Sequence, residues 1–308
     1  MGKNGYSKPY RSGNNIWDIS ACTLYEGISI AVIAFAHHKG GTGKTTTCLQ
    51  VAGFLSKKGR RVLIIDTDPQ ANATLGLGIH PDTPARNIYH FYVEQSSLEE
   101  PIHLSDCIIR TVSGIDLVPS HLDLVGAEPM LYQYPERYEI LVREIGLIKD
   151  RYDHILIDTP PFLGQYMINA LIAADRNILV FSPDSFAMNG YENIRLILKD
   201  IDELLGKKIQ IHCAVLNRWS SETVKPGLFD RFFAMIGKKP EEPLNPGDEL
   251  KALLEGQIRR DIPHVILIPE SKLVVASQKN GMPLAFSHPE DPAAIIFSRI
   301  ADDLDMGR

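Results

Sequence analysis

The chain has 308 residues, of which 44% are hydrophobic and 23% are charged. This composition is that of an ordinary globular protein, and it excludes a largely disordered or collagen-like chain. The net charge of −6 argues against a nucleic-acid binder that is basic all over its surface, although a local basic patch could still bind a phosphate backbone.

The cysteines and the apolar stretches indicate the cellular setting. The cysteines form no CxxC pair, so we expect neither a disulfide framework nor a zinc ribbon. No apolar stretch reaches the roughly 18 to 20 residues that a membrane-spanning helix needs. The polar N-terminus does not resemble a signal peptide. We therefore expect a cytoplasmic protein.

The first residues differ in composition from the rest of the chain. They are polar, rich in glycine and asparagine, and without periodicity, and Lys3, Lys8 and Arg11 precede the first acidic residue. We predict a flexible N-terminal leader over 1–27 and one domain over 28–308.

From residue 28 onward, short apolar runs alternate with helical patterns, as in strand and helix units around a parallel sheet. The runs are Ile28–Ala36, Val62–Ile65, Ile155–Ile157, Ile178–Phe181, Ile211–Leu216 and Val265–Ile268. Clear helical patterns cover Thr45–Lys57, Glu136–Ile148, Ala187–Leu205 and Pro292–Leu304. The sequence predicts an α/β fold with a doubly wound, mostly parallel sheet and helices on both faces.

A glycine-rich segment, KGGTGKTT over 39–46, follows the first strand and opens the first helix. Its glycines let successive backbone N–H groups face an anion, Lys44 can reach the outer phosphates, and Thr45 offers a hydroxyl to Mg²⁺. His38 stands where the strict P-loop pattern has its first glycine. The residues expected to contact a nucleotide here are Lys39, Gly40, Gly41, Thr42, Gly43, Lys44, Thr45 and Thr46.

Two more strands are predicted to end in acids. Asp66 and Asp68 end the strand that starts at Val62, and both can approach a metal-bound triphosphate if this strand lies beside the P-loop strand. Asp158 ends the strand that starts at Ile155, where it can accept a hydrogen bond from a magnesium-bound water or from Thr45. Taken singly, these acids could equally be a turn after a strand or a helix cap.

Together, the P-loop segment and the DTDPQ segment at 66–70 resemble the ParA/MinD family of P-loop ATPases, and the likeness extends over most of residues 29–305. The resemblance implies a P-loop NTPase fold, with ATP and Mg²⁺ as cofactors. It identifies Lys39 as the signature lysine, which in the family reaches the phosphates bound by the other subunit of a dimer. It implies that Asp68 positions the attacking water. Thr45, Asp66 and Asp158 are the expected magnesium ligands, Asp66 acting through the water shell of the ion.

Two later residues are matched to the adenine end of the nucleotide. Asn217 ends the strand that starts at Ile211, and the resemblance implies that it recognises the adenine edge. A turn asparagine is the other interpretation. Pro269 follows the strand that starts at Val265, and its backbone is expected to border the base.

The resemblance implies slow hydrolysis of ATP that times a homodimerisation switch. Among the branches of the family, it favours a Soj-like partition ATPase that binds nonspecific DNA, works with a ParB-like partner to segregate a chromosome or plasmid, and associates with the nucleoid. The alternative is a MinD-type positioning ATPase without DNA contact. The acidic C-terminus at 300–308 argues against a membrane-binding helix of the MinD kind, and the leader is too short for an operator-binding helix-turn-helix domain.

A local basic segment supports the DNA hypothesis, although a solvated helix face would look the same. Seven basic residues lie between positions 207 and 239 against two acids, a local balance of +5. The basic residues are Lys207, Lys208, Arg218, Lys225, Arg231, Lys238 and Lys239.

Overall fold

In a computed structural model of the chain, the described residues are 31–94, 102–183, 187–219, 262 and 264–307. The leader predicted over 1–27 lies outside these residues. So do four of the seven basic residues between positions 207 and 239.

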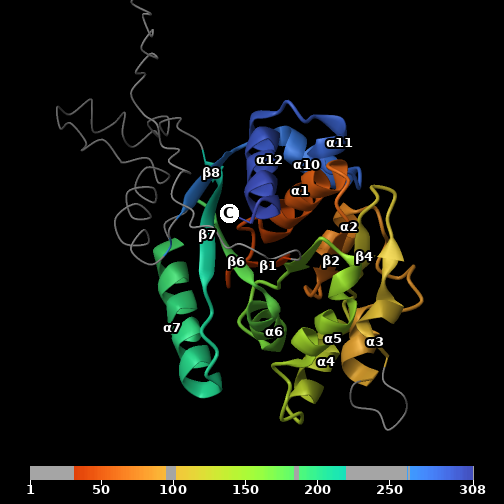
Figure 1. Cartoon of the computed structure of the whole chain (residues 1–308), viewed down its shortest axis with the longest axis vertical. Coiled ribbons are helices and arrows are strands. Elements are labelled where there is room, and N and C mark those ends of the chain that lie inside the picture. Colours follow the sequence, from red (N-terminus) through yellow and green to blue (C-terminus); the bar gives the residue numbers. More distant parts are fainter. Residues whose placement is uncertain (1–30, 95–101, 184–186, 220–261, 263, 308) are drawn as a thin grey trace, which may run out of the picture.

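The described residues form an eight-stranded sheet (Figure 1). Its strands are β1 (Ala31–Ala36), β2 (Val62–Asp66), β3 (Ile109–Arg110), β4 (Asp116–Val118), β5 (His154–Asp158), β6 (Arg176–Phe181), β7 (Ile211–Trp219) and β8 (Val265–Pro269). Their order in space is β3-β4-β2-β5-β1-β6-β7-β8, and every neighbouring pair is parallel except β3 with β4. The predicted doubly wound, mostly parallel sheet is confirmed.

All six predicted apolar runs contain strands, whereas β3 and β4 were not predicted. These two strands have two and three residues and include the exposed Arg110 and the half-buried Asp116. No long apolar run marks them, because both are short; β3 is the edge strand, and β4 pairs with it on one side and with β2 on the other.

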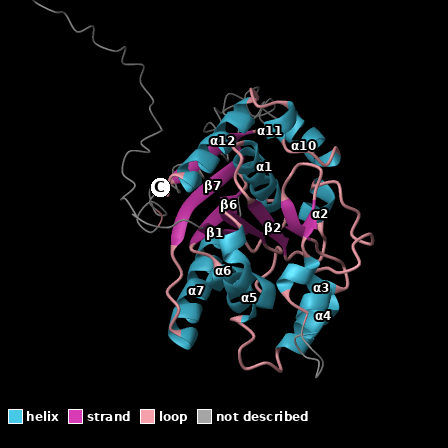
Figure 2. Cartoon of the chain, turned by 45° about the vertical axis from the view of Figure 1, so that its right-hand side comes forward, coloured by secondary structure: helices cyan, strands magenta, loops and turns pink. Residues whose placement is uncertain are grey.

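Helices cover both faces of the sheet (Figure 2). One face carries α1 (Lys44–Lys57), α2 (Asn72–Gly76), α10 (Lys272–Lys279), α11 (Leu284–Ser287) and α12 (Pro292–Asp305). The other carries α3 (Ile88–Glu94), α4 (Leu124–Leu131), α5 (Ile140–Ile148), α6 (Gln165–Ala173) and α7 (Ala187–Leu205). The central strands β1, β2, β5 and β6 are buried from both sides, which is why their apolar runs are continuous.

The helix predicted from Glu136 begins at Ile140 instead. The residues before it form turns, in which Glu139 N donates to the carbonyl oxygen of Glu136. Among the described residues, none of the helices combines the length and the apolar character needed to cross a bilayer.

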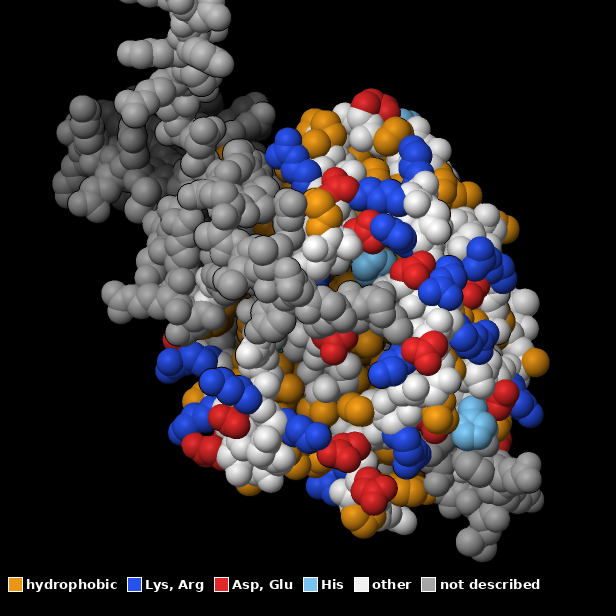
Figure 3. Space-filling model, viewed as in Figure 1, with side chains coloured by type: hydrophobic (Ala, Val, Ile, Leu, Met, Phe, Trp, Pro, Cys, Tyr) orange, Lys and Arg blue, Asp and Glu red, His pale blue; other side chains and the backbone are white. Residues whose placement is uncertain are grey.

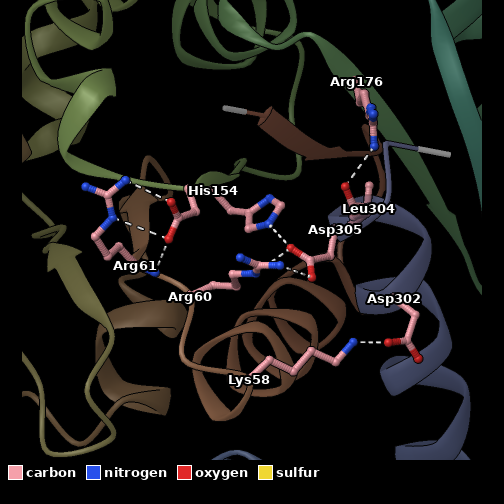
Figure 4. Close-up of polar contacts among 9 residues, drawn as sticks. Lys58, Arg60, Arg61, His154, Arg176, Asp302, Leu304 and Asp305 are labelled. Carbon is pink, nitrogen blue, oxygen red and sulfur yellow. Dashed lines mark hydrogen bonds and ion pairs between the residues drawn. The ribbon is translucent and has the colours of Figure 1, made fainter. Parts of the chain in front are cut away.

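At the amino ends of the parallel strands, ion pairs and hydrogen bonds hold helix α12 against the sheet (Figure 4). The Asp305 carboxylate contacts Arg60 Nε at 2.7 Å and His154 Nε2 at 3.1 Å. Lys58 pairs with Asp302, and Arg176 Nη1 donates to the carbonyl oxygen of Leu304 at 3.2 Å. We call this set of contacts the amino-edge network. It ties the end of α12 to the start of β2, β5 and β6.

Candidate nucleotide site

The glycine-rich segment forms a loop between β1 and α1. Gly41 and Gly43 have φ values of +75° and +99°, which side chains with a Cβ rarely adopt. A Cβ at Gly43 would also lie 1.8 Å from Asn217 Nδ2. The loop therefore needs glycine at Gly43 for its conformation and for its close packing against the end of β7.

His38 and His37 explain the departure from the strict P-loop pattern. The two rings stack with centroids 4.9 Å apart, and the edge of His37 packs on Phe181. His37 Nδ1 accepts a hydrogen bond from the backbone N–H of Lys39 at 3.0 Å. A histidine pair thus shapes the start of the loop where the strict pattern has a glycine.

Lys44 is buried at the first turn of α1. Its Nζ donates to the carbonyl oxygen of Lys39 at 3.1 Å, which curls the loop around the amine. Burial lowers the pKa of Lys44, while the nearby Asp158 and Asp68 oppose that shift. A phosphate anion in the loop would add negative charge close to this buried amine and favour its charged form.

Strand register brings two acids together beneath the loop. Asp66 and Asp158 are paired residues on the neighbouring strands β2 and β5, and both are fully buried. Asp66 accepts hydrogen bonds from Asp68 N and from both N and Oγ1 of Thr74. Burial nevertheless raises its pKa to about 7, and the charge of Asp68 adds to the shift. Burial and the nearby like charge thus both oppose ionisation of the Asp66 carboxyl group.

Asp158 joins the second acidic strand to the P-loop. Thr45 Oγ1 donates to Asp158 Oδ2 at 2.7 Å. Asp158 Oδ1 is buried and has no hydrogen-bond partner in the described structure, and burial together with Asp66 raises the pKa of the carboxyl group. An unpartnered carboxylate oxygen beside a threonine hydroxyl fits a magnesium-bound water, because Mg²⁺ keeps much of its water shell.

Within the described ranges, no three His, Cys, Asp or Glu side chains are arranged to hold a metal ion by themselves. A hard cation here would take its remaining ligands from water and from phosphate oxygens, which is how Mg²⁺ is usually bound beside nucleotides.

Asp68 lies nearer the opening of the site. It lines the cleft above the loop, and its Oδ1 accepts a hydrogen bond from the N–H of Gln70 at 2.9 Å. Burial raises its pKa, against the effect of Gln70 and Lys44.

The cleft has a volume of about 710 Å³. It is lined by nine of the predicted site residues: Gly40, Gly41, Gly43, Lys44, Thr45, Thr46, Asp68, Asn217 and Pro269. The other four, Lys39, Thr42, Asp66 and Asp158, do not line it. The structure thus brings together both ends of the predicted nucleotide site, since Asn217 and Pro269 line the same cleft as the P-loop and Asp68.

One wall of the cleft is formed by α2 and α10. The sequence matched residues 268–276 to a family segment expected to border the base, but it assigned no role to the side chains of this wall. Leu75, Val274, Val275 and Gln278 line the cleft, and Gln278 Nε2 donates to Thr46 Oγ1 at 3.0 Å. Leu75 and Gln278 lie outside the matched segments, so only the packing of α10 beside α1 and α2 reveals their place in the cleft.

Asn217 lies on the P-loop side of the cleft. Its Nδ2 donates to the carbonyl oxygen of Thr42 at 3.3 Å. Arg218, which was considered only as part of the basic segment, donates from Nη2 to the carbonyl oxygen of Gly41 at 2.7 Å. The contact of Asn217 with adenine stays a prediction.

Comparisons with known proteins agree with the nucleotide site inferred from the geometry. A family model described as AAA domain matches residues 30–211. An uncharacterised protein of Methanocaldococcus jannaschii is 31% identical over 278 residues, which are 89% of this chain and 97% of that protein. The chromosome-partitioning ATPase Soj of Thermus thermophilus is 28% identical over 88% of this chain and 94% of its own length.

A solved structure extends the likeness to the arrangement in space. Cobyrinic acid a,c-diamide synthase of Mycobacterium smegmatis, with a bound ATP analogue and magnesium, superposes with a TM-score of 0.68 at 25% identity. The match covers 89% of this chain and 94% of that one.

Proposed function

The chain belongs to the ParA/MinD family of P-loop ATPases, and on that premise we propose that it is an ATP-dependent dimerisation switch that partitions DNA. In this proposal it hydrolyses ATP slowly, binds DNA without sequence preference, and moves a chromosome or plasmid with a ParB-like partner. The observation that carries the proposal is a P-loop that lines a cleft of nucleotide size and is joined through Thr45 to Asp158, the strand partner of Asp66.

The residues of the loop account for nucleotide binding. Backbone N–H groups over 40–45 would cradle the phosphates at the N-terminus of α1, and Lys44 would contact their outer oxygens. Thr45, Asp66 and Asp158 would hold Mg²⁺, the acids through its waters. The ion would neutralise charge on the phosphate oxygens during transfer.

Asp68 is the residue proposed to orient the attacking water. It lines the cleft together with Lys44, two residues beyond the end of β2. Its carboxylate already accepts a hydrogen bond from Gln70 N, and among the described residues Glu270 is the other acid that lines the cleft. This sparse arrangement supports slow turnover.

The position of Lys39 supports the proposed dimer. It is half-buried at the rim, between the buried His37 and the exposed Gly40, and it does not line the cleft of its own chain. In the proposal, its amine reaches the phosphates held by a second copy. ATP would then join the two copies, and hydrolysis would release them.

DNA binding is the least supported part of the proposal. The chromosome-partitioning relative favours it, but some of the described basic residues pair with acids. Lys207 pairs with Glu139 at 3.2 Å, and Lys199 pairs with Glu203 at 3.3 Å. Figure 3 shows basic and acidic side chains interspersed over the described part of one face. This observation favours a second candidate function, a positioning ATPase of the MinD type that makes no DNA contact.

Retention on nonspecific DNA separates the two candidates. The full chain is passed over immobilised DNA with ATP or with ADP, at increasing salt, and in parallel over vesicles of anionic phospholipid. Partition predicts ATP-dependent retention on DNA that weakens with salt, because phosphate contacts release counterions. Equal retention with both nucleotides, or none, would refute the DNA proposal, and ATP-dependent retention on vesicles alone would support the second candidate.

Two substitutions test the switch itself. Lys39→Ala should abolish ATP-dependent dimers in size-exclusion chromatography, because the proposed contact across the dimer is lost. Asp68→Ala should instead accumulate dimers, because ATP is bound but not hydrolysed. If the two variants behave alike, both assignments are wrong.

A further inference from the structure

The end of β7 is irregular where it passes the P-loop. Leu216 pairs with Leu267 of β8, and the next paired residues are Trp219 and Pro269. Two residues of β7 therefore stand opposite one residue of β8, which is a β-bulge at Asn217 and Arg218. Bulges beside active sites redirect side chains that a regular strand would point elsewhere.

The backbone at this bulge is strained. Arg218 has a φ of +57°, and among the described residues Ala71 is the other non-glycine residue with a positive φ. Any residue with a Cβ is sterically disfavoured in this conformation. The conformation therefore persists only where surrounding contacts hold it. Arg218 itself lines the cleft, and Ala71 stands between two residues that do, Gln70 and Asn72. The strain is thus concentrated at the nucleotide site.

The bulge aims two donors at the P-loop. Asn217 Nδ2 donates to the carbonyl oxygen of Thr42, and Arg218 Nη2 donates to that of Gly41. Arg218 N also donates to Asn217 Oδ1 at 2.9 Å, which orients the asparagine amide. A loop whose N–H groups face an anion must turn its carbonyl groups away from that anion, and those groups then need donors of their own.

We propose that Asn217 and Arg218 form a clamp on the carbonyl side of the P-loop, and that Arg218 is a positioning residue for ATP binding. This inference rests on the proposed function for the identity of the ligand. The clamp holds the peptides at Gly41 and Thr42 so that their N–H groups face the phosphates. The guanidinium also brings positive charge to the rim of the cleft, close to where an anion would bind.

Amide hydrogen exchange tests the clamp without any nucleotide. Peptides covering 38–46 are followed by mass spectrometry in the full chain and in the variants Arg218→Ala and Arg218→Gly. Both variants should exchange about 10-fold faster in this segment, because one charged hydrogen bond to the loop is lost. Exchange in α12 should stay unchanged. Unchanged exchange over 38–46, or acceleration throughout the chain, would overturn the clamp.

The glycine variant separates positioning from simple stability. Glycine adopts a positive φ without penalty, so Arg218→Gly should unfold at the same temperature as the parent chain or higher, yet still lose the loop contact. A lower unfolding temperature with normal exchange over 38–46 would show that Arg218 acts only on the fold.

Nucleotide titration supplies the functional measurement. Arg218→Ala should weaken binding of ATP about 10-fold, and Arg218→Lys should fall between it and the parent, because one amine replaces the planar fork. Arg195→Ala is the matched control, since Arg195 is an exposed arginine of α7 that pairs with Glu192. Wild-type affinity in Arg218→Ala would overturn the clamp. A parent chain that binds no ATP would instead refute the proposed function, while the exchange experiment still decides the clamp.

Discussion

At the carboxyl edge of the sheet, Asp66 and Asp158 lie side by side, buried, with raised pKa values. At the amino edge, Asp305 is held between Arg60 and His154, and these hydrogen bonds lower its pKa although burial opposes them. One edge gathers like charges and the other pairs opposite ones. The first arrangement is suited to binding a cation and a phosphate, and the second to fastening a helix.

The two edges also respond to pH with opposite sign. The pKa of Asp66, about 7 in the fold, exceeds that of an unfolded aspartate, so its contribution to stability falls as pH rises from about 4 to 7. His154 and Asp305 have lowered pKa values. Their contributions are present above the unfolded pKa values, about 6.5 and 4, and are lost as pH falls below them.

The largest expected effect comes from neutralising one acid at the carboxyl edge. Asp158→Asn should lower Mg²⁺-dependent ATP hydrolysis about 10–100-fold, because the partner of Thr45 and of the metal-bound water is altered. The same change should raise the free energy of unfolding of the nucleotide-free chain at about pH 8 by about 1 kcal/mol, because a buried like charge is removed. Phosphate release and urea unfolding measure the two.

The matched control is the acid of the amino edge. Asp305→Asn should leave hydrolysis unchanged and lower the free energy of unfolding by about 1–2 kcal/mol, because charged hydrogen bonds to Arg60 and His154 are lost. If both variants lose stability equally, the distinction between the two edges fails.

An intermediate effect is expected from the histidine of the amino edge. His154→Gln keeps an N–H donor toward Asp305 but does not titrate. Between about pH 7.5 and 5.5, the free energy of unfolding should therefore fall by about 1 kcal/mol less in the variant than in the parent chain. Urea unfolding at both pH values measures this difference, and the same pH dependence in both proteins would contradict it.

The smallest effect is expected at the exposed pair of the amino edge. The side chains of Lys58 and Asp302 are 29% and 46% exposed. Lys58→Ala and Asp302→Ala should each cost about 0.5 kcal/mol or less, vanishing at high salt, with ATP affinity unchanged. A cost well above about 1 kcal/mol from either would mean that single surface pairs hold α12.

The sequence predicted the parts of the site that are contiguous in the chain. The loop over 39–46 and the acids Asp66 and Asp158 follow apolar runs directly, and the end of a buried strand fixes where such residues lie. The central strands were predicted for the same reason. The short strands β3 and β4 were not, since two and three residues make no apolar run.

The rest of the site depends on packing between distant segments. Gln278 reaches Thr46 because α10 lies against α1, and Arg218 reaches Gly41 because β7 bulges against β8. Neither the bulge nor the docking of α10 leaves a mark in the local sequence. The amino-edge network likewise joins residues up to 245 positions apart, such as Arg60 and Asp305.

Helix α1 spans the distance between the two edges. It starts at Lys44 in the phosphate loop, and the residue that follows its last turn, Lys58, belongs to the amino-edge network. Its 14 residues form a rod about 21 Å long. A displacement of its first turn on ligand binding would be transmitted to α12, because the two helices pack against each other in one buried cluster. A fluorescent reporter attached beside Asp302 would then sense occupancy of the cleft without touching it.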